Sequence, residues 1–318
     1  MSHPEALVLV PGPTDAGKRL DRFLQEQLPA YTRSRIQQWI KAGRVSVDGR
    51  QVKAGFPLRG GEQIQVCPEE PPPLRAFPEP IPIRVLYEDQ DVIAVDKPAG
   101  MVVHAGAGVR EGTLVNALLY RFGQLGETGD PLRPGIVHRL DRWTSGVLLV
   151  ARNERAHQAL ASQFASRQVE KYYLALVHGQ LPQDAGKIDA PIARDPRRRT
   201  RMTARSRSGR AALTFYRVLE RLPGFTYVEV RIATGRTHQI RTHFSAIGHP
   251  VVGDPTYGAP RQIPGMPSLG RYFLHAWRIR FRQPSSGQWV TVESPLPAEL
   301  DQWLQQLRHR LGVGDRGI

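Results

Sequence analysis

The chain has 318 residues, and its 44 Lys and Arg against 29 Asp and Glu give a formal net charge of +15. This length allows about two domains, and so strong a positive charge predicts a polyanionic partner. A single cysteine, Cys67, excludes an internal disulfide and a cysteine-based zinc or redox site. No apolar run is long enough to span a membrane, and the N-terminus lacks the basic residues that begin a secretory signal. The sequence therefore predicts a cytoplasmic protein without a membrane span.

A proline-rich stretch predicts the main domain boundary. Seven prolines lie between Pro68 and Pro82. Because such a sequence suits neither a helix nor a central strand, we expect an extended linker over residues 68–83. This linker separates a small domain at 18–67 from a large domain at 84–311.

The small domain is predicted to contain two helices and a hairpin. Apolar residues recur at helical spacing over 20–28 and again over 36–40. Valines then alternate with polar residues around Asp48-Gly49, which is a hairpin turn signal. Residues 18–66 carry ten Lys or Arg against four Asp or Glu, so we expect an RNA-binding module; a solvated basic surface without a ligand is the alternative. The cations expected to contact RNA are Arg33, Arg35 and Lys41.

The large domain is predicted to be a sheet with flanking helices. Apolar or alternating runs predict strands at 92–95, 147–150, 173–177, 213–219 and 227–232. Capping residues and helical spacing predict helices at 113–122, 154–167, 237–247 and 300–311. Because strands and helices do not alternate strictly, the pattern favours an α+β fold with a mixed, largely antiparallel sheet over a doubly wound one.

An arginine tract interrupts the large domain. Eight of the seventeen residues at 194–210 are Arg, and one, Asp195, is acidic. So many arginines repel one another unless an anion neutralises them. If that anion is the phosphate backbone of RNA, the affinity for RNA depends on the salt concentration. We expect the tract to contact RNA, where Arg planes can also stack on unpaired bases; a surface loop without a ligand is the alternative. The contacts are assigned to Arg197, Arg198, Arg199 and Arg201.

One loop before an apolar strand carries a carboxylate between two cations. In GIVHRLDRWTSG, residues 135–146, Asp141 lies between Arg139 and Arg142. This placement suits a carboxylate held ionised by neighbouring cations. From the residues alone, a structural ion pair is the commoner interpretation and catalysis the other, because ion pairs in a fold also perturb acids.

Three histidines in residues 234–257 invite a metal interpretation. His238 and His243 are five residues apart, whereas zinc-binding helices place two histidines four residues apart with a Glu between them. The segment offers these two histidines neither a cysteine nor a third ligand at a suitable spacing. We therefore expect no metal site.

Arg236 and Arg241 in the same segment are better explained as partners of an anion or a carboxylate, since Arg offers a fixed fork of donors. One of them could meet Asp141. The sequence contains no P-loop, GxGxxG or GxSxG pattern. Neither a nucleotide cofactor nor serine hydrolase chemistry is expected.

At GIVHRLDRWTSGVLLVAR the sequence resembles the RluA/RluD-type ribosomal large-subunit pseudouridine synthases. Further blocks in the same order, spread over most of residues 85–297, are VIAVDKPAGMVVHAG, GTLVNALL, VEKYYLALVHG, TGRTHQIRTHFSAIGHPVVGDPTYG and LHAWRIRF. The N-terminal segment is similar to the small RNA-binding domain shared with ribosomal protein S-four. One departure is Trp143, where the family usually has an acidic or amide residue. It leaves Asp141 as the only carboxylate in that loop.

The resemblance implies an isomerase that breaks the N1 glycosidic bond of a uridine, turns the uracil and joins C5 to the same sugar carbon, without cofactor or metal. The target base would be flipped out of its stack. The resemblance places it in a stem-loop of large-subunit ribosomal RNA or of a ribosomal precursor. Asp141 would be the catalytic carboxylate, acting either as nucleophile at the anomeric carbon or as base at the neighbouring carbon. Arg241 would be its ion-pair partner, with Arg236 as the second choice.

The resemblance also assigns residues around the base. Tyr172 and Tyr173 are adjacent on a predicted strand and point to opposite faces; the K-x-Y-x-A spacing of the family selects Tyr173 to stack on the uracil and leaves Tyr172 to packing. Arg139 would fill the space vacated by the base, with a phosphate contact as the alternative. Ile240 is expected either in the uracil pocket or in the core.

Two other functions stay open on the sequence. One is a ribosome-binding protein that holds RNA without catalysis, and the other is an enzyme of the same family that acts on transfer RNA. A monomer is the default expectation for the oligomeric state.

Overall fold

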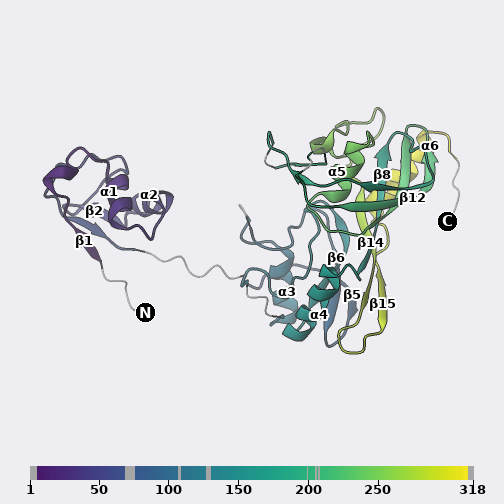
Figure 1. The fold of residues 1–318 in the computed structure, drawn as a ribbon, viewed down its shortest axis with the longest axis horizontal. Helices are drawn as coiled ribbons and strands as arrows, with labels where there is room; N and C mark the ends of the chain where they lie inside the picture. Colours follow the sequence, from purple (N-terminus) through teal and green to yellow (C-terminus); the bar gives the residue numbers. More distant parts are fainter. Residues whose placement is uncertain are drawn as a thin grey trace. The chain divides into compact units, whose positions relative to one another are not determined.

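The computed structural model describes residues 6–68, 76–106, 109–126, 130–198, 200–204, 206 and 208–313. The chain divides into two units, Met1–Leu74 and Arg75–Ile318 (Figure 1). Each unit has its own hydrophobic core. Within the described ranges, no helix is both long enough and apolar enough to cross a membrane.

The N-terminal unit packs two helices against a small sheet. The predicted helices and hairpin are all present, and Asp48 and Gly49 both have positive φ, as the turn signal requires. The sheet order is β1-β4-β2-β3, so β1 adds residues that precede position 18 to this unit. The elements are β1 (Leu7–Leu9), a 3-10 helix η1 (Pro13–Asp15), α1 (Leu20–Gln27), α2 (Arg33–Lys41), β2 (Val45–Val47), β3 (Arg50–Gln51) and β4 (Ile64–Val66).

The second unit is built on a nine-stranded sheet in the described part of the chain. Its order is β5-β6-β7-β14-β8-β13-β12-β9, with β15 paired to β14, and β7 and β14 are the parallel pair among antiparallel neighbours. The expected mixed, largely antiparallel sheet is confirmed. The strands are β5 (Arg84–Glu88), β6 (Val92–Lys97), β7 (Ser145–Ala151), β8 (Glu170–His178), β9 (Ala185–Asp189), β12 (Leu213–Leu222), β13 (Phe225–Ile232), β14 (Leu274–Arg282) and β15 (Trp289–Glu293).

Four predicted helices flank this sheet. Thr113 and Asn153 cap the first two by accepting hydrogen bonds from backbone N–H groups in the first turn. The second helix ends two residues early, before Arg167 with φ of 61°, and the third begins two residues late, because His238 has φ of 55°. The helices are α3 (Leu114–Phe122), α4 (Glu154–Ala165), α5 (Gln239–Ala246) and α6 (Ala298–Arg310), and a 3-10 helix η2 spans Pro255–Tyr257.

The helices cover both faces of the sheet because successive strand residues point to opposite sides. In β7, Leu148 and Val150 share a core with α3, whereas Val147 and Leu149 pack with α4. At the other end of the sheet, α5 shares a core with Tyr173 of β8, and α6 packs over the opposite face. Figure 1 shows α3 and α4 near β5 and β6, and α5 and α6 near β8 and β12.

The last part of the expected linker lies against the second unit. The carbonyl of Phe77 accepts a hydrogen bond from the Asn116 side chain at 2.7 Å. The Glu79 carboxylate accepts the backbone N–H of Gly112 at 3.0 Å, and Ile83 is buried in the core. Residues 76–83 are therefore part of this unit's packing, because their apolar side chains and carbonyls find partners along α3.

Gly146 allows the parallel pairing of β7 with β14, and this pairing positions the loop that carries Asp141. Gly146 pairs with Ala276 where β7 runs beside β14, and it has φ of 113°. A Cβ there would lie 2.1 Å from the carbonyl oxygen of Ala276, so only glycine permits this approach. The loop that carries Asp141 is thereby held next to β14 and β8.

Candidate active site

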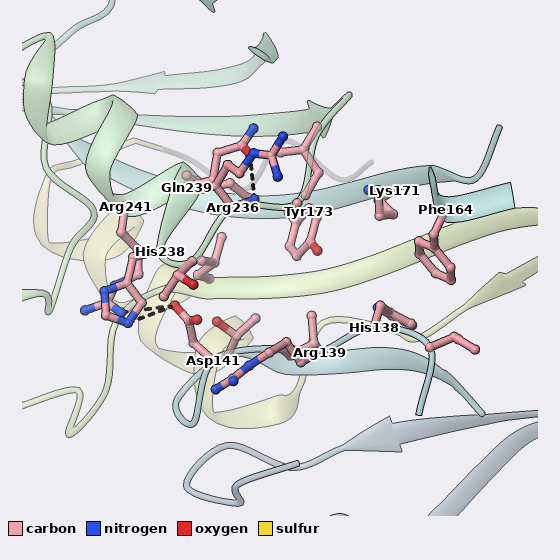
Figure 2. A pocket seen from close by; sticks show the side chains of 18 of the residues that line it. His138, Arg139, Asp141, Phe164, Lys171, Tyr173, Arg236, His238, Gln239 and Arg241 are labelled. Carbon is pink, nitrogen blue, oxygen red and sulfur yellow. Dashed lines mark hydrogen bonds and ion pairs between the residues drawn. The ribbon is translucent and has the colours of Figure 1, made fainter. Parts of the chain in front are cut away.

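A cleft of about 370 Å³ brings together six of the residues predicted from the sequence. This volume lies within the range typical of small-molecule sites. The walls are the loop before β7, the first half of β8, the end of α4, and the turn that leads into α5 (Figure 2). The predicted residues on these walls are Arg139, Asp141, Tyr173, Arg236, Ile240 and Arg241.

Asp141 lies in this cleft with one carboxylate oxygen held in place. Its Oδ2 accepts a hydrogen bond from Nη1 of Arg241 at 3.0 Å and one from the Tyr272 hydroxyl at 3.5 Å. The side chain remains 19% exposed. The carboxylate is thus oriented by fixed donors and still open to a molecule in the cleft.

Arg241 is itself anchored by a second carboxylate. Its Nε and Nη2 donate to the two oxygens of Asp254 at 2.6 and 3.0 Å, and the Asp254 side chain is 1% exposed. Burial works against the charged guanidinium, but the hydrogen bonds to Asp254 outweigh it, so the pKa of Arg241 is raised. The cation is therefore permanently charged and points its remaining nitrogen at Asp141.

Two aromatic rings hold the Arg241 guanidinium. The ring centroid of Tyr272 lies 4.2 Å and that of Tyr257 4.9 Å from its central carbon, distances at which cation–π attraction operates. Burial, reinforced by the Asp141 charge, raises the pKa of Tyr272. This hydroxyl therefore stays protonated and can donate to the carboxylate.

The turn before α5 aims Arg241 at the cleft. The buried Gln239 side chain accepts from Thr234 Oγ1 and the Arg236 N–H, and donates to Leu213 and Thr214 on β12. All hydrogen-bonding positions of this amide are used, which fixes the turn.

His238, also on this turn, lies next to the ion pair without joining it. Its Nδ1 is 2.9 Å from the Tyr257 hydroxyl and its Nε2 is 4.0 Å from Oδ2 of Asp141. Burial lowers the pKa of His238, so the ring is neutral near pH 7. Within the described residues, no group of three potential metal ligands occurs.

A buried lysine fixes the Asp141 loop from behind. The Lys97 ammonium donates to the carbonyls of Pro98, Met101 and Arg142 at 2.8, 2.9 and 3.2 Å. Burial, followed by repulsion from Arg271, lowers the pKa of Lys97 to about 7. Three carbonyl acceptors satisfy the three donors of an ammonium. Lys97 therefore ties the end of β6 to the residue that follows Asp141.

The two tyrosines of β8 face opposite sides, as their adjacency predicts. Tyr173 is buried and lines the cleft, and burial, reinforced by the Asp141 charge, raises its pKa. Tyr172 lies on the other face beneath the Arg278 guanidinium, 4.2 Å from its ring centroid. Ile240, which is 4% exposed, both lines the cleft and belongs to the core.

The arginines around Asp141 have different surroundings. Arg236 donates its Nε to the carbonyl of Ala211 at 3.1 Å, and no contact joins it to Asp141 in the described part of the chain. Arg139 is exposed at the mouth of the cleft, and among residues 130–198 and the other described ranges it has no hydrogen-bond or ion-pair partner. Of the two candidates for the partner of Asp141, the structure brings Arg241 to it.

The three N-terminal cations also differ. Arg33 is exposed but bound to the buried carboxylate of Asp21 at 3.0 Å, so it contributes to folding of the small unit. Arg35 lies over the Trp39 ring at 5.9 Å. Lys41 is exposed at the end of α2 and borders a groove that Lys53 and Phe56 also line.

Part of the arginine tract forms a hairpin docked near the cleft. β10 (Ala193–Arg194) pairs with β11 (Met202–Thr203), and the Met202 N–H donates to the Tyr257 hydroxyl at 2.9 Å. Arg201 stacks on the Tyr257 ring at 5.1 Å. Arg197 and Arg198 are exposed at the tip, and Arg199 lies outside the described residues.

Sequence reasoning missed several residues that build this site. Asp254, Tyr272 and Lys97 act on Asp141 or Arg241 from other parts of the chain, and Lys171 lines the cleft beside Tyr173. The only sign of Asp254 in the sequence is its place in the segment that also carries Arg241. No pattern in the sequence indicates that Tyr272 or Lys97 reaches the site.

The comparisons with known proteins agree with this geometry. The model of the RNA pseudouridylate synthase family matches residues 91–246, and that of the S4 domain matches residues 18–64. The ribosomal large subunit pseudouridine synthase D of Xanthomonas campestris pv. campestris is 44% identical over 302 residues, covering 92% of this chain and 90% of that protein. An uncharacterised RNA pseudouridine synthase of Bacillus subtilis is 43% identical over 291 residues, covering 92% and 94%.

A solved structure is similar as well. The human RNA pseudouridylate synthase domain containing 1 superposes with a TM-score of 0.55 at 31% identity, covering 76% of this chain and 98% of that one. The resemblance seen in the sequence motifs is thus confirmed over most of the chain. The protein belongs to the RNA pseudouridine synthase family and carries an S4 domain over residues 18–64.

Proposed function

We propose that the protein isomerises specific uridines in a stem-loop of large-subunit ribosomal RNA, and that Asp141 is the catalytic carboxylate. The observation that carries the proposal is the Asp141 carboxylate, oriented by Arg241 and still exposed to a cleft that Tyr173 lines. The choice of RNA is supported by the S4 domain and by the names of relatives such as the Xanthomonas enzyme.

The chemistry follows from this arrangement. The target uridine leaves its stack, which costs little for a loop base, and its uracil enters the cleft against Tyr173. Asp141 then acts on the ribose, either by attacking the anomeric carbon or by removing a proton from the neighbouring carbon. In both routes Asp141 acts as a carboxylate, and Arg241 orients it through the hydrogen bond from Nη1 to Oδ2. Arg139, exposed and beside Asp141, would occupy the space that the base leaves.

Mapping of pseudouridines by carbodiimide-dependent stops of reverse transcription tests the proposal, in cells with and without the protein. We expect stops at a few positions of large-subunit ribosomal RNA to disappear when the protein is absent and to return with the wild-type gene. Loss of stops only in transfer RNA would contradict the proposed substrate. An unchanged map would contradict the activity and favour a protein that only holds RNA.

The arginine hairpin gives a separate prediction about binding. Replacing the exposed Arg197 and Arg198 by Gln should weaken RNA binding and flatten its salt dependence. Two lost phosphate contacts reduce the slope of log affinity against log salt by about 1.4 for a single strand. The measurement is a titration of binding at several salt concentrations.

A matched control for this titration is Arg84→Gln, which removes one exposed positive charge from the edge strand β5. The slope of Arg84→Gln should equal that of the wild type. If the Arg197 and Arg198 variant also keeps the wild-type slope of log affinity against log salt, the arginine tract does not contact RNA.

A further inference from the structure

Lys171 is a cation in the cleft that has no counterion among the described residues. Lys171 precedes Tyr173 by two residues on β8, so both side chains point to the same face. Figure 2 shows Tyr173 between Asp141 and Lys171, and Phe164 beyond the lysine. The Lys171 ammonium is 5.6 Å from the Phe164 ring centroid, and across the described ranges it has no hydrogen-bond acceptor or carboxylate partner.

The described residues that line the cleft with Lys171 offer it no unpaired negative charge. His138, in the loop before β7, accepts the Leu149 N–H at 2.9 Å, and burial lowers its pKa to about 3, so the ring is neutral. Arg236, in the turn after β13, is itself a cation. Asp141 is the only carboxylate among the described residues that line the cleft, and it is paired with Arg241.

Lys171 therefore differs from the structural lysine of the same unit. Lys97 is fully buried, but its ammonium donates to three carbonyls. Burial lowers the pKa of Lys171 to about 8 with no opposing interaction. A half-buried charge that contacts an aromatic ring but, among the described residues, no acceptor or carboxylate costs folding free energy. Such a cost is retained where a ligand supplies the missing acceptor.

We propose that Lys171 donates to the uracil in the cleft and stabilises the negative charge that the detached base carries. The inference rests on the proposed function and deepens it. When the bond between C1′ and N1 breaks, its electron pair stays on the uracil, which becomes an anion delocalised over N1, O2 and O4. This holds whether Asp141 attacks the sugar or removes its proton.

The rest of the reaction balances without a further reagent besides water. C5 joins C1′ with an electron pair of the uracil ring; the ester bond between Asp141 and C1′ breaks in the first route, and Asp141 returns its proton to the neighbouring carbon in the second. Water takes up the C5 proton and supplies one proton to N1. Lys171 keeps its own protons throughout and acts through its charge and one hydrogen bond. Residues two apart on a strand lie roughly 6.6 Å apart, so a uracil stacked on Tyr173 with its sugar at Asp141 would turn an exocyclic oxygen toward Lys171.

The test compares Lys171→Met, Lys171→Arg and wild type by single-turnover rate and by RNA affinity. Loss of one donor to a developing anion typically slows a reaction by about 100-fold or more, so we expect this loss in Lys171→Met with unchanged RNA affinity. Lys171→Arg keeps the charge and should recover part of the rate. Lys187→Met, which removes an exposed charge on β9 outside the cleft, should match the wild type.

Two further readouts separate this role from a structural one. Because the uncompensated charge is removed, Lys171→Met should unfold at a temperature equal to or above that of the wild type. Lys171 is charged below pH 8 and loses its charge above it, so the ratio of wild-type to Lys171→Met rates should be largest below pH 8 and fall above it.

The failures are distinguishable. A wild-type rate in Lys171→Met, or a loss of rate matched by an equal loss of RNA affinity, would overturn the role of Lys171 and leave the proposed function intact. A ratio that does not change with pH would also overturn it. A wild-type protein that forms no pseudouridine on any RNA would instead remove the proposed function.

Discussion

Asp141→Asn is expected to abolish pseudouridine formation while RNA affinity and folding persist. An amide of the same shape can neither attack the sugar carbon nor accept its proton, and loss of a positioned base costs about 100-fold to 10,000-fold in rate. The fold should survive because Arg241 keeps its two hydrogen bonds to Asp254 when the charge of Asp141 is gone. Single-turnover conversion of an RNA stem-loop, with RNA binding measured in parallel, checks both halves of the prediction.

Asp189→Asn is a matched control for this variant. Asp189 is exposed at the end of β9 and lies outside the cleft, so the same loss of one carboxylate charge should leave activity unchanged. Full activity in Asp141→Asn would remove Asp141 from the chemistry. Loss of RNA binding together with activity would instead make Asp141 part of the RNA-binding surface.

The elements that the sequence predicts correctly are those with local signals. The hairpin of the N-terminal unit follows from Asp48-Gly49, which both adopt positive φ. The start of α3 follows from Thr113, whose hydroxyl accepts the Asn116 N–H. Such features depend on a few neighbouring residues, so one amino-acid sequence is enough to predict them.

Elements that depend on distant partners were harder to predict. β14 is not among the predicted strands. Arg278 and Arg280 do alternate with Ile279 and Phe281, but the charged residues make the segment look exposed in the sequence. In the fold these cations stack on aromatic rings of neighbouring strands, as Arg278 does on Tyr172. β1, of three residues, is not among the predicted strands, and its role becomes visible when it pairs with β4.

The candidate site shows the same division. Asp141 and Arg241 each stand in a recognisable motif, and they are 100 residues apart in sequence. The groups that fix their geometry are not marked in this way: Tyr272 reaches Asp141 across 131 residues, and Lys97 reaches the carbonyl of Arg142 across 45. A motif can be recognised in the sequence. A buried partner from a distant strand can be assigned only once the structure shows which strands lie side by side.

Asp254→Ala is expected to lower the free energy of unfolding by about 3–5 kcal/mol, because it leaves the Arg241 guanidinium buried without its main partner. Activity should fall as well, since Arg241 would then be free to move away from its present contact with Asp141. Urea unfolding followed by circular dichroism gives the free energy, and single-turnover conversion gives the activity. Glu88→Ala is the surface control: its ion pair with Arg152 is more than a third exposed on both sides, and such pairs contribute about 0–1 kcal/mol.

A double variant separates the cost of an unpaired charge from the worth of the pair. In Arg241→Met/Asp254→Leu both charges are replaced by apolar side chains of similar size, and such replacements of buried ion pairs are often neutral or stabilising. The double variant should therefore be more stable than Asp254→Ala but stay inactive, because Asp141 has lost the cation that orients it. If the double variant is as unstable as Asp254→Ala, the packing of Arg241 against Tyr257 and Tyr272 stabilises the fold more than its ion pair with Asp254 does. Recovered activity would mean that Asp141 works without Arg241.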